Sequence, residues 1–174
     1  MEAIFDLLKI TLPASIVLLG MYLTARNFLE KEFERRLAEI KLKNTETITT
    51  IRLQAYERMC LFLERIAPEN MLTRLQVSQF TSEELQQILL HEIRNEFAHN
   101  FSQQMYMSNE AWNMIQTARE EIVSLINNSA AQVAPETNAL ELAKKILENA
   151  NNYDIRPTIA AIGFLKNELK QLFS

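Results

Sequence analysis

The stretch Ile4–Leu23 constrains this chain more than any other. From Ile10 to Leu23 the sequence reads ITLPASIVLLGMYL, fourteen residues without a charge, and the extension back to Ile4 adds only Asp6 and Lys9. A helix of twenty residues is about 30 Å long, which matches the hydrocarbon core of a bilayer. Residues Ile4–Leu23 are therefore predicted to form a transmembrane anchor.

Two other interpretations of this stretch remain open. A secretory signal peptide starts with basic residues and ends at small ones, whereas this chain starts with Glu2 and Asp6 and has no A-x-A-like triplet after Leu23. A buried helix of a soluble core or oligomer is the stronger rival, because the uncharged run is short and Pro13 can kink it. Proline is nevertheless frequent in membrane helices, and Lys9 can extend toward the interface.

The charges after the stretch predict its orientation. Six basic residues come after it, namely Arg26, Lys31, Arg35, Arg36, Lys41 and Lys43. The positive-inside rule places such a segment in the cytoplasm. We therefore expect a single-pass protein of the inner (cytoplasmic) membrane, with its body facing the cytoplasm.

Composition restricts the body to a few classes. Two glycines and four prolines in 174 residues exclude a hairpin-rich β fold and a glycine-rich phosphate loop. The formal net charge of −4 argues against general nucleic-acid binding, and anionic lipid head groups explain the locally basic stretch Arg26–Lys43. A single cysteine, Cys60, allows neither an internal disulfide nor a cysteine zinc site, and its apolar neighbours suggest a buried thiol.

Residues 25–67 contain no glycine or proline and predict a long helix. Apolar residues recur there at steps compatible with three and four: Phe33, Leu37, Ile40, Ile51, Ala55, Phe62 and Ile66. Asn44 and Thr47 fall on the same track, and Asn44–Thr50 is poor in strong helix formers. Three interpretations of this pattern remain open: a polar layer in a coiled coil, a bend near Asn44–Thr50, or a solvated stalk.

The remaining residues predict shorter helices joined by short loops. Pro68 ends the long helix, Thr81–Glu84 (TSEE) is a capping box, Ser108 starts another helix, Ala134-Pro135 breaks it, and Pro157 opens the last one. One helix has heptad spacing over Ala111, Ile115, Ala118, Ile122 and Leu125. Trp112 is expected to be buried beside Met107 and the last helix. The fold class is all-α: a transmembrane helix over residues 1–24, a helical stalk over 25–50 and an antiparallel helical bundle over 51–174.

Several short segments of this sequence are similar to segments of a known group of proteins. These are Lys9–Pro13 (KITLP), Ile51–Glu57 (IRLQAYE), Leu61–Ile66 (LFLERI), His99–Gln104 (HNFSQQ) and Ser108–Trp112 (SNEAW). Together they resemble a small uncharacterised family of Bacteroidota proteins. The resemblance spans most of the chain and implies an N-terminal anchor and a helical body, but it implies no activity.

One stretch, His91–His99, contains both histidines of the chain. Within it, Arg94–His99 (RNEFAH) resembles the R-x4-H motif of the helical HEPN ribonucleases. That resemblance implies RNA cleavage by Arg94 and His99, commonly at a dimer interface. On a straight helix the two residues lie about 140° apart, so one protomer does not bring them together easily, and the acidic net charge does not favour RNA.

A metal site is the other chemistry that this stretch suggests. Glu92, Glu96 and His99 fall within about 60° on one helical face, and Glu96-x-x-His99 has the spacing found in di-iron bundles. Such a site needs a second helix of this kind, which only a homodimer supplies here. The simpler alternative is a polar helix face on which His99 forms hydrogen bonds. No Ser-His-Asp signature is present.

The sequence favours a membrane-anchored scaffold or adaptor over an enzyme. Its heptad track and its long proximal helix offer surfaces to partner helices, and we expect a homo-oligomer or a subunit of a membrane complex. No cofactor, catalytic residue or metal ligand is assigned on this interpretation. The competing class is an enzyme, in which the nuclease hypothesis of Arg94 and His99 stands ahead of the metal hypothesis of Glu92, Glu96 and His99.

Overall fold

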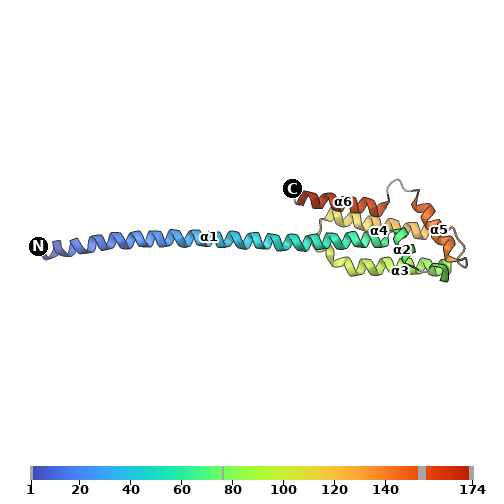
Figure 1. Ribbon diagram of the computed structural model, residues 1–174, viewed down its shortest axis with the longest axis horizontal. Coiled ribbons are helices and arrows are strands. Elements are labelled where there is room, and N and C mark those ends of the chain that lie inside the picture. The colour runs from blue at the N-terminus through green and yellow to red at the C-terminus, as the bar shows by residue number, and fades with distance from the viewer. Residues whose placement is uncertain (1, 76, 153–155, 173–174) are drawn as a thin grey trace. The chain divides into compact units, whose positions relative to one another are not determined.

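A computed structural model describes residues 2–75, 77–152 and 156–172, and these form helices and short connections (Figure 1). The α-helices are α1 (Glu2–Ile66), α2 (Pro68–Arg74), α3 (Ser82–Asn100), α4 (Asn109–Ala130), α5 (Ala139–Ala150) and α6 (Pro157–Leu172). Two 3-10 helices, η1 (Val77–Gln79) and η2 (Phe101–Tyr106), lie between them. The all-α prediction is confirmed. By its contacts the chain divides into two units, Met1–Thr49 and Thr50–Ser174.

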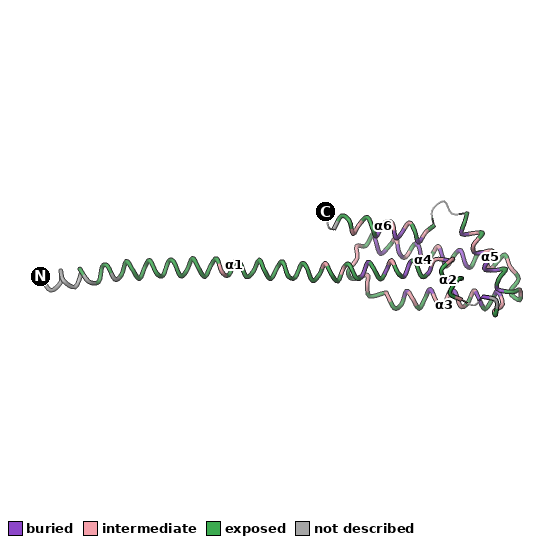
Figure 2. The backbone as a smooth tube through the Cα atoms, viewed as in Figure 1, coloured by how far each residue is buried: buried purple, intermediate pink, exposed green. Residues whose placement is uncertain are grey.

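The first unit consists of the N-terminal part of α1. Between residues 15 and 48, every residue except Glu32 is exposed (Figure 2). The α-helix continues through Pro13 and through Asn44–Thr50 without interruption. Thr45, Thr47 and Thr49 each donate a hydrogen bond to the carbonyl four residues earlier, at 2.8–2.9 Å, which satisfies their hydroxyls within the helix.

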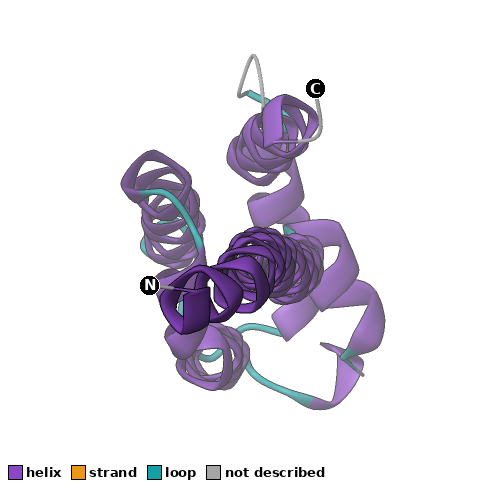
Figure 3. Cartoon of the chain, turned by 90° about the vertical axis from the view of Figure 1, so that its left-hand side faces the viewer, coloured by secondary structure: helices purple, strands orange, loops and turns teal. Residues whose placement is uncertain are grey.

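The second unit is a helical bundle. The C-terminal part of α1 and helices α3, α4 and α6 run lengthwise beside one another, as the two views show (Figures 1 and 3). Helix α4 packs against α3, α5 and α6. Short helix α5 also contacts α2 and η1. The chain reverses direction between α1, α3, α4 and α6, so the lengthwise helices are antiparallel to their sequence neighbours.

A cluster of buried apolar side chains forms the core of the described part of this unit. The heptad track of α4 is buried along its whole length, as predicted: Ala111, Ile115, Ala118, Ile122 and Leu125. The last turns of α1 bury five further core residues: Tyr56, Met59, Phe62, Leu63 and Ile66. Two apolar side chains of the bundle lie outside this core, since Leu140 is exposed and Ile88 is half-buried.

The burial of Trp112 is confirmed, and the aromatic rings that contact it come from α3 and η2. The indole stacks on Phe97 of α3, with ring centroids 5.5 Å apart, and meets Phe101 of η2 edge-on at 5.9 Å. Phe97 in turn contacts Phe62 of α1 at 5.7 Å. Four aromatic rings therefore join α1, α3, η2 and α4, and we call this set (Phe62, Phe97, Phe101 and Trp112) the aromatic cluster.

The helix starts agree closely with the sequence signals. Thr81 and Glu84 form a complete capping box, in which the Thr81 hydroxyl accepts from the Glu84 amide and the Glu84 carboxylate accepts from the Thr81 amide. Ser108 caps α4 by accepting from the Ala111 amide at 3.0 Å. Asn138 caps α5 in the same way, with Leu140 as the donor.

The end of α4 differs from the prediction. The helix ends at Ala130, before the expected break at Ala134-Pro135. The Gln132 side chain donates to the Asn128 carbonyl at 3.0 Å and so satisfies one of the carbonyls that a helix end leaves unpaired. The tight turns after it bring Thr137 next to the start of α3, where its carbonyl accepts from the Ser82 amide at 2.8 Å.

Candidate functional site

Helix α3 carries the stretch His91–His99 and presents two faces. One face is apolar and buried through Leu85, Leu89, Ile93 and Phe97, four residues spaced by four. The other face carries the polar residues on which the chemical hypotheses rest. Because α3 is a regular α-helix up to Asn100, the angular positions deduced from the sequence hold in the structure.

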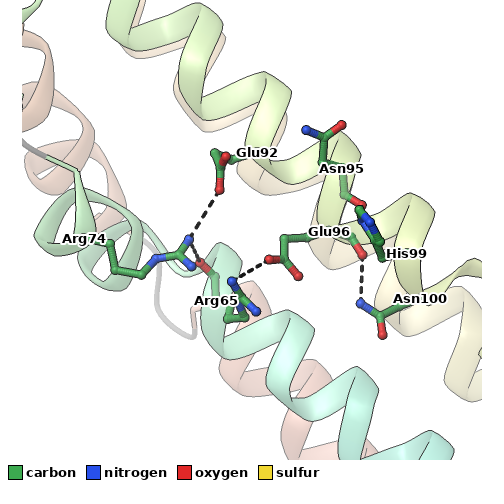
Figure 4. Close-up of polar contacts among 7 residues, drawn as sticks. All are labelled: Arg65, Arg74, Glu92, Asn95, Glu96, His99 and Asn100. Carbon is green, nitrogen blue, oxygen red and sulfur yellow. Dashed lines mark hydrogen bonds and ion pairs between the residues drawn. The ribbon is translucent and has the colours of Figure 1, made fainter.

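Arg94 and His99 lie apart on this helix. Both side chains are exposed, and five residues along a regular helix separate them by about 140°. Arg94 lines a groove toward α4. The Nδ1 atom of His99 lies 2.7 Å from the Asn95 carbonyl of its own helix (Figure 4). One chain therefore does not assemble the Arg–His pair that a HEPN-like site requires.

Two of the three proposed metal ligands, Glu92 and Glu96, pair with arginines of neighbouring helices. A Glu96 carboxylate oxygen lies 2.8 Å from the guanidinium of Arg65 in α1, and Glu92 lies 4.0 Å from Arg74 in α2 (Figure 4). Arg74 also donates to the Arg65 carbonyl at 3.5 Å. Over the described ranges, no group of three His, Cys, Asp or Glu side chains is placed to hold a metal ion. Through these two ion pairs, Glu96 connects α3 to α1 and Glu92 connects α3 to α2.

A groove on the other side of α3 was not predicted. It has a volume of about 500 Å³, lies between α3 and α4, and is lined by Leu90, Ile93, Arg94, Phe97, Arg119, Glu120, Val123 and Asn127. The Arg119 guanidinium lies over the Phe97 ring, 4.2 Å from its centroid, and its Nη2 atom is 3.2 Å from Glu120. Arg94 makes no ion pair with any described residue. The groove thus combines an apolar floor with a polar rim formed by Arg94 and the Arg119–Glu120 ion pair.

Sequence reasoning missed this groove because its two arginines are far apart in the chain. Arg119 comes directly after Ala118 of the heptad track, and Arg94 comes directly after the buried Ile93. Each pattern predicts a residue at the edge of a buried helix face. Only the packing of α3 against α4 brings the two edges together.

Two further titratable groups have shifted pKa values. Burial raises the pKa of the Tyr56 phenol, and the hydrogen bond to Glu168 raises it further. Burial also raises the pKa of the Cys60 thiol, which is half-buried rather than fully buried. A thiol with a raised pKa stays protonated at neutral pH and is a poor nucleophile.

The comparisons with known proteins point to one family. A family of unknown function, DUF7935, matches residues 2–172. The chain belongs to this family. The comparisons with curated proteins and with solved structures gave no match. Membership in DUF7935 agrees with the resemblance to an uncharacterised family, whereas the Bacteroidota grouping and the HEPN likeness stay predictions.

The ion pairs of α3 yield a prediction for this DUF7935 chain. Replacing Glu96 by alanine should lower the free energy of unfolding by about 1 kcal/mol, because its carboxylate is largely buried against Arg65. Replacing His99 by alanine should change it by less than about 0.5 kcal/mol, since the ring is exposed. Thermal unfolding of both variants, with and without added zinc, iron or manganese, measures these effects.

A metal site would give a different result. Both substitutions would then lower the melting temperature only in the presence of metal, and the metal would stabilise the unaltered chain. The control is the double variant that carries Arg65→Ala and Glu96→Ala. If the loss of stability comes from the Arg65–Glu96 ion pair, the double variant will lose less stability than the sum of the two single variants.

Proposed function

We propose that this chain is a membrane-anchored adaptor subunit. The start of α1 lies in the bilayer, and the helical bundle binds a partner protein at the cytoplasmic face. The observation that carries the proposal is the exposure of the apolar run. Large apolar side chains between residues 12 and 23 are 48–69% exposed, namely Leu12, Ile16, Val17, Leu18, Leu19, Met21, Tyr22 and Leu23. One helix near the N-terminus is long and apolar enough to span a membrane.

The polar groups of this run also suit a bilayer. The Ser15 hydroxyl donates to the Thr11 carbonyl at 2.8 Å, and the Thr24 hydroxyl donates to the Gly20 carbonyl at 2.7 Å. Hydrocarbon offers no partners to polar groups, so side chains that bond within their own helix are tolerated there. The six basic residues from Arg26 to Lys43 support a cytoplasmic position for the stalk and the bundle.

The adaptor role rests on the groove between α3 and α4. A helical segment of a partner that carries both acidic and apolar side chains fits a groove with an apolar floor and Arg94 at its rim. The ion pairs of Glu92 with Arg74 and of Glu96 with Arg65 support a structural role for these two carboxylates. No observation on the described residues favours the nuclease or the metal hypothesis over this role.

Deleting residues 1–24 should release the chain from membranes into the soluble fraction. The reason is that the deletion removes the exposed apolar run while leaving the bundle core untouched. Fractionation of cells that express either form, with carbonate washing of the membranes, measures the effect. Recovery of the full chain in the soluble fraction without detergent would rule out the anchor.

The orientation and the adaptor role need separate measurements. Protease added outside intact spheroplasts should leave the bundle undigested, and digestion there would reverse the orientation. Proteins cross-linked to the solubilised chain should be lost on Arg94→Glu but retained on Arg58→Glu, a substitution at another exposed arginine outside the groove. Specific RNA cleavage, abolished by both Arg94→Ala and His99→Ala, would favour the nuclease instead.

A further inference from the structure

The first unit carries a second set of exposed apolar residues beyond the anchor. Phe33, Leu37 and Ile40 are 43–64% exposed, although they lie on a helix that also bears many charges. They occupy positions separated by four and three residues, and Asn44 and Thr47 continue the same spacing. These five residues, which we call the stalk seam, form one stripe along α1.

The spacing of the stalk seam is that of a two-stranded coiled coil. Steps of four, three, four and three assign Phe33, Ile40 and Thr47 to d positions and Leu37 and Asn44 to a positions. A single asparagine at an a position is the best-attested device for fixing the register and number of strands, because it pairs with its own counterpart. The Asn44 side chain has no hydrogen-bond partner among the described residues, whereas the Thr47 hydroxyl bonds to the Lys43 carbonyl and leaves its methyl group for the seam.

We infer that the stalk seam pairs with the stalk seam of a second copy of this chain, parallel and in register. The parallel direction rests on the proposed function, since two chains anchored in one membrane point the same way. A parallel pair also places each seam residue opposite its own counterpart, so Asn44 meets Asn44. The seam extends over about 21 Å at 1.5 Å per residue, which is too short to hold two free chains together strongly. Confinement in one membrane supplies the local concentration that a short seam needs.

The charges beside the seam repel each other across a parallel pair of chains. A charge substitution there should therefore change how strongly the two chains associate. In a parallel pair Arg36, at a g position, faces Lys41, at an e position, of the other copy. Glu32 partly neutralises Arg36 within its own chain, at 3.1 Å. Replacing Lys41 by glutamate should therefore strengthen a parallel pair. In an antiparallel pair, the same change would set two like charges against each other, because Glu34 and Lys41 are the facing e positions.

Disulfide cross-linking of the full chain in its membrane tests the pairing. In a Cys60→Ser background, Leu37→Cys and Asn44→Cys should cross-link at least ten times faster than Leu42→Cys under mild oxidation. Leu42 is the matched control because it is apolar, 71% exposed and on the opposite face, at an f position. Adding Lys41→Glu to the Leu37→Cys variant should increase the cross-linked fraction about two-fold or more.

The possible outcomes separate this inference from the proposed function. Equal rates at all three positions, or cross-links at none, would contradict the seam. A decrease on Lys41→Glu would contradict the parallel direction. Sedimentation of the same samples reports the anchor independently. Seam-specific cross-linking of a chain found in the soluble fraction would support the pairing and contradict the membrane anchor.

Discussion

Replacing Trp112 by alanine should lower the free energy of unfolding of the bundle by about 3–5 kcal/mol. The indole is 9% exposed and lies in the core cluster. Its loss leaves a cavity and also removes the stacked contact with Phe97 and the edge contact with Phe101. Aromatic contacts of this kind contribute beyond the area that they bury. Urea unfolding of the solubilised full chain, monitored by circular dichroism, measures the loss.

Two control variants separate the cavity from other causes. Trp112→Phe keeps a ring in the cluster and should cost less than half as much as Trp112→Ala. Met105→Ala removes an apolar side chain that is 78% exposed and should change the stability by less than about 0.5 kcal/mol. The fluorescence of Trp112, the only tryptophan, should be blue-shifted and poorly quenched by iodide. A red-shifted spectrum that iodide quenches freely would contradict the burial.

The helix starts were predictable because their signals are local. A capping box requires only that Thr81 and Glu84 be three residues apart, and the backbone amides that they satisfy lie in the same turn. Pro157 begins α6 for an equally local reason, since its fixed φ suits the first turn of a helix. The heptad track of α4 was predictable because burial repeats with the helical period.

The site was not predictable to the same degree, because its contacts join distant parts of the chain. A helical wheel places Glu92, Glu96 and His99 on one face, but it does not show that Arg65 and Arg74 lie opposite that face. In the sequence, two carboxylates on one helical face are equally compatible with metal binding and with ion pairs. The ion pairs with Arg65 and Arg74 give both carboxylates partners within the chain, and the metal hypothesis stays a prediction.

The hydrogen-bond network of Tyr56, Glu168 and Ser108 also joins distant parts of the chain and was not predicted. Its removal should cause the second large loss of stability. The Glu168 carboxylate of α6 accepts from the Tyr56 hydroxyl of α1 at 2.8 Å and from the Ser108 hydroxyl at 3.0 Å. Glu168→Ala should lower the free energy of unfolding by about 2–3 kcal/mol, because it leaves the buried Tyr56 hydroxyl without its acceptor. Tyr56→Phe should cost about 1 kcal/mol, since Glu168 keeps Ser108 as a donor. Glu121→Ala, at a carboxylate of α4 that makes no ion pair with any described residue, is the control.

The pH dependence of stability tests the same network at its phenol. Burial and Glu168 raise the pKa of Tyr56 above its ordinary value of about 10. Above pH 10 the unfolded chain loses this proton before the folded chain does, so the stabilisation that is complete below pH 10 declines as the pH rises through the folded pKa. Denaturant unfolding between pH 9 and 11 should therefore show a steeper loss of stability in the unaltered chain than in Tyr56→Phe. Parallel curves for the two would show that the Tyr56 phenol ionises alike in both states and would refute its role as the buried donor to Glu168.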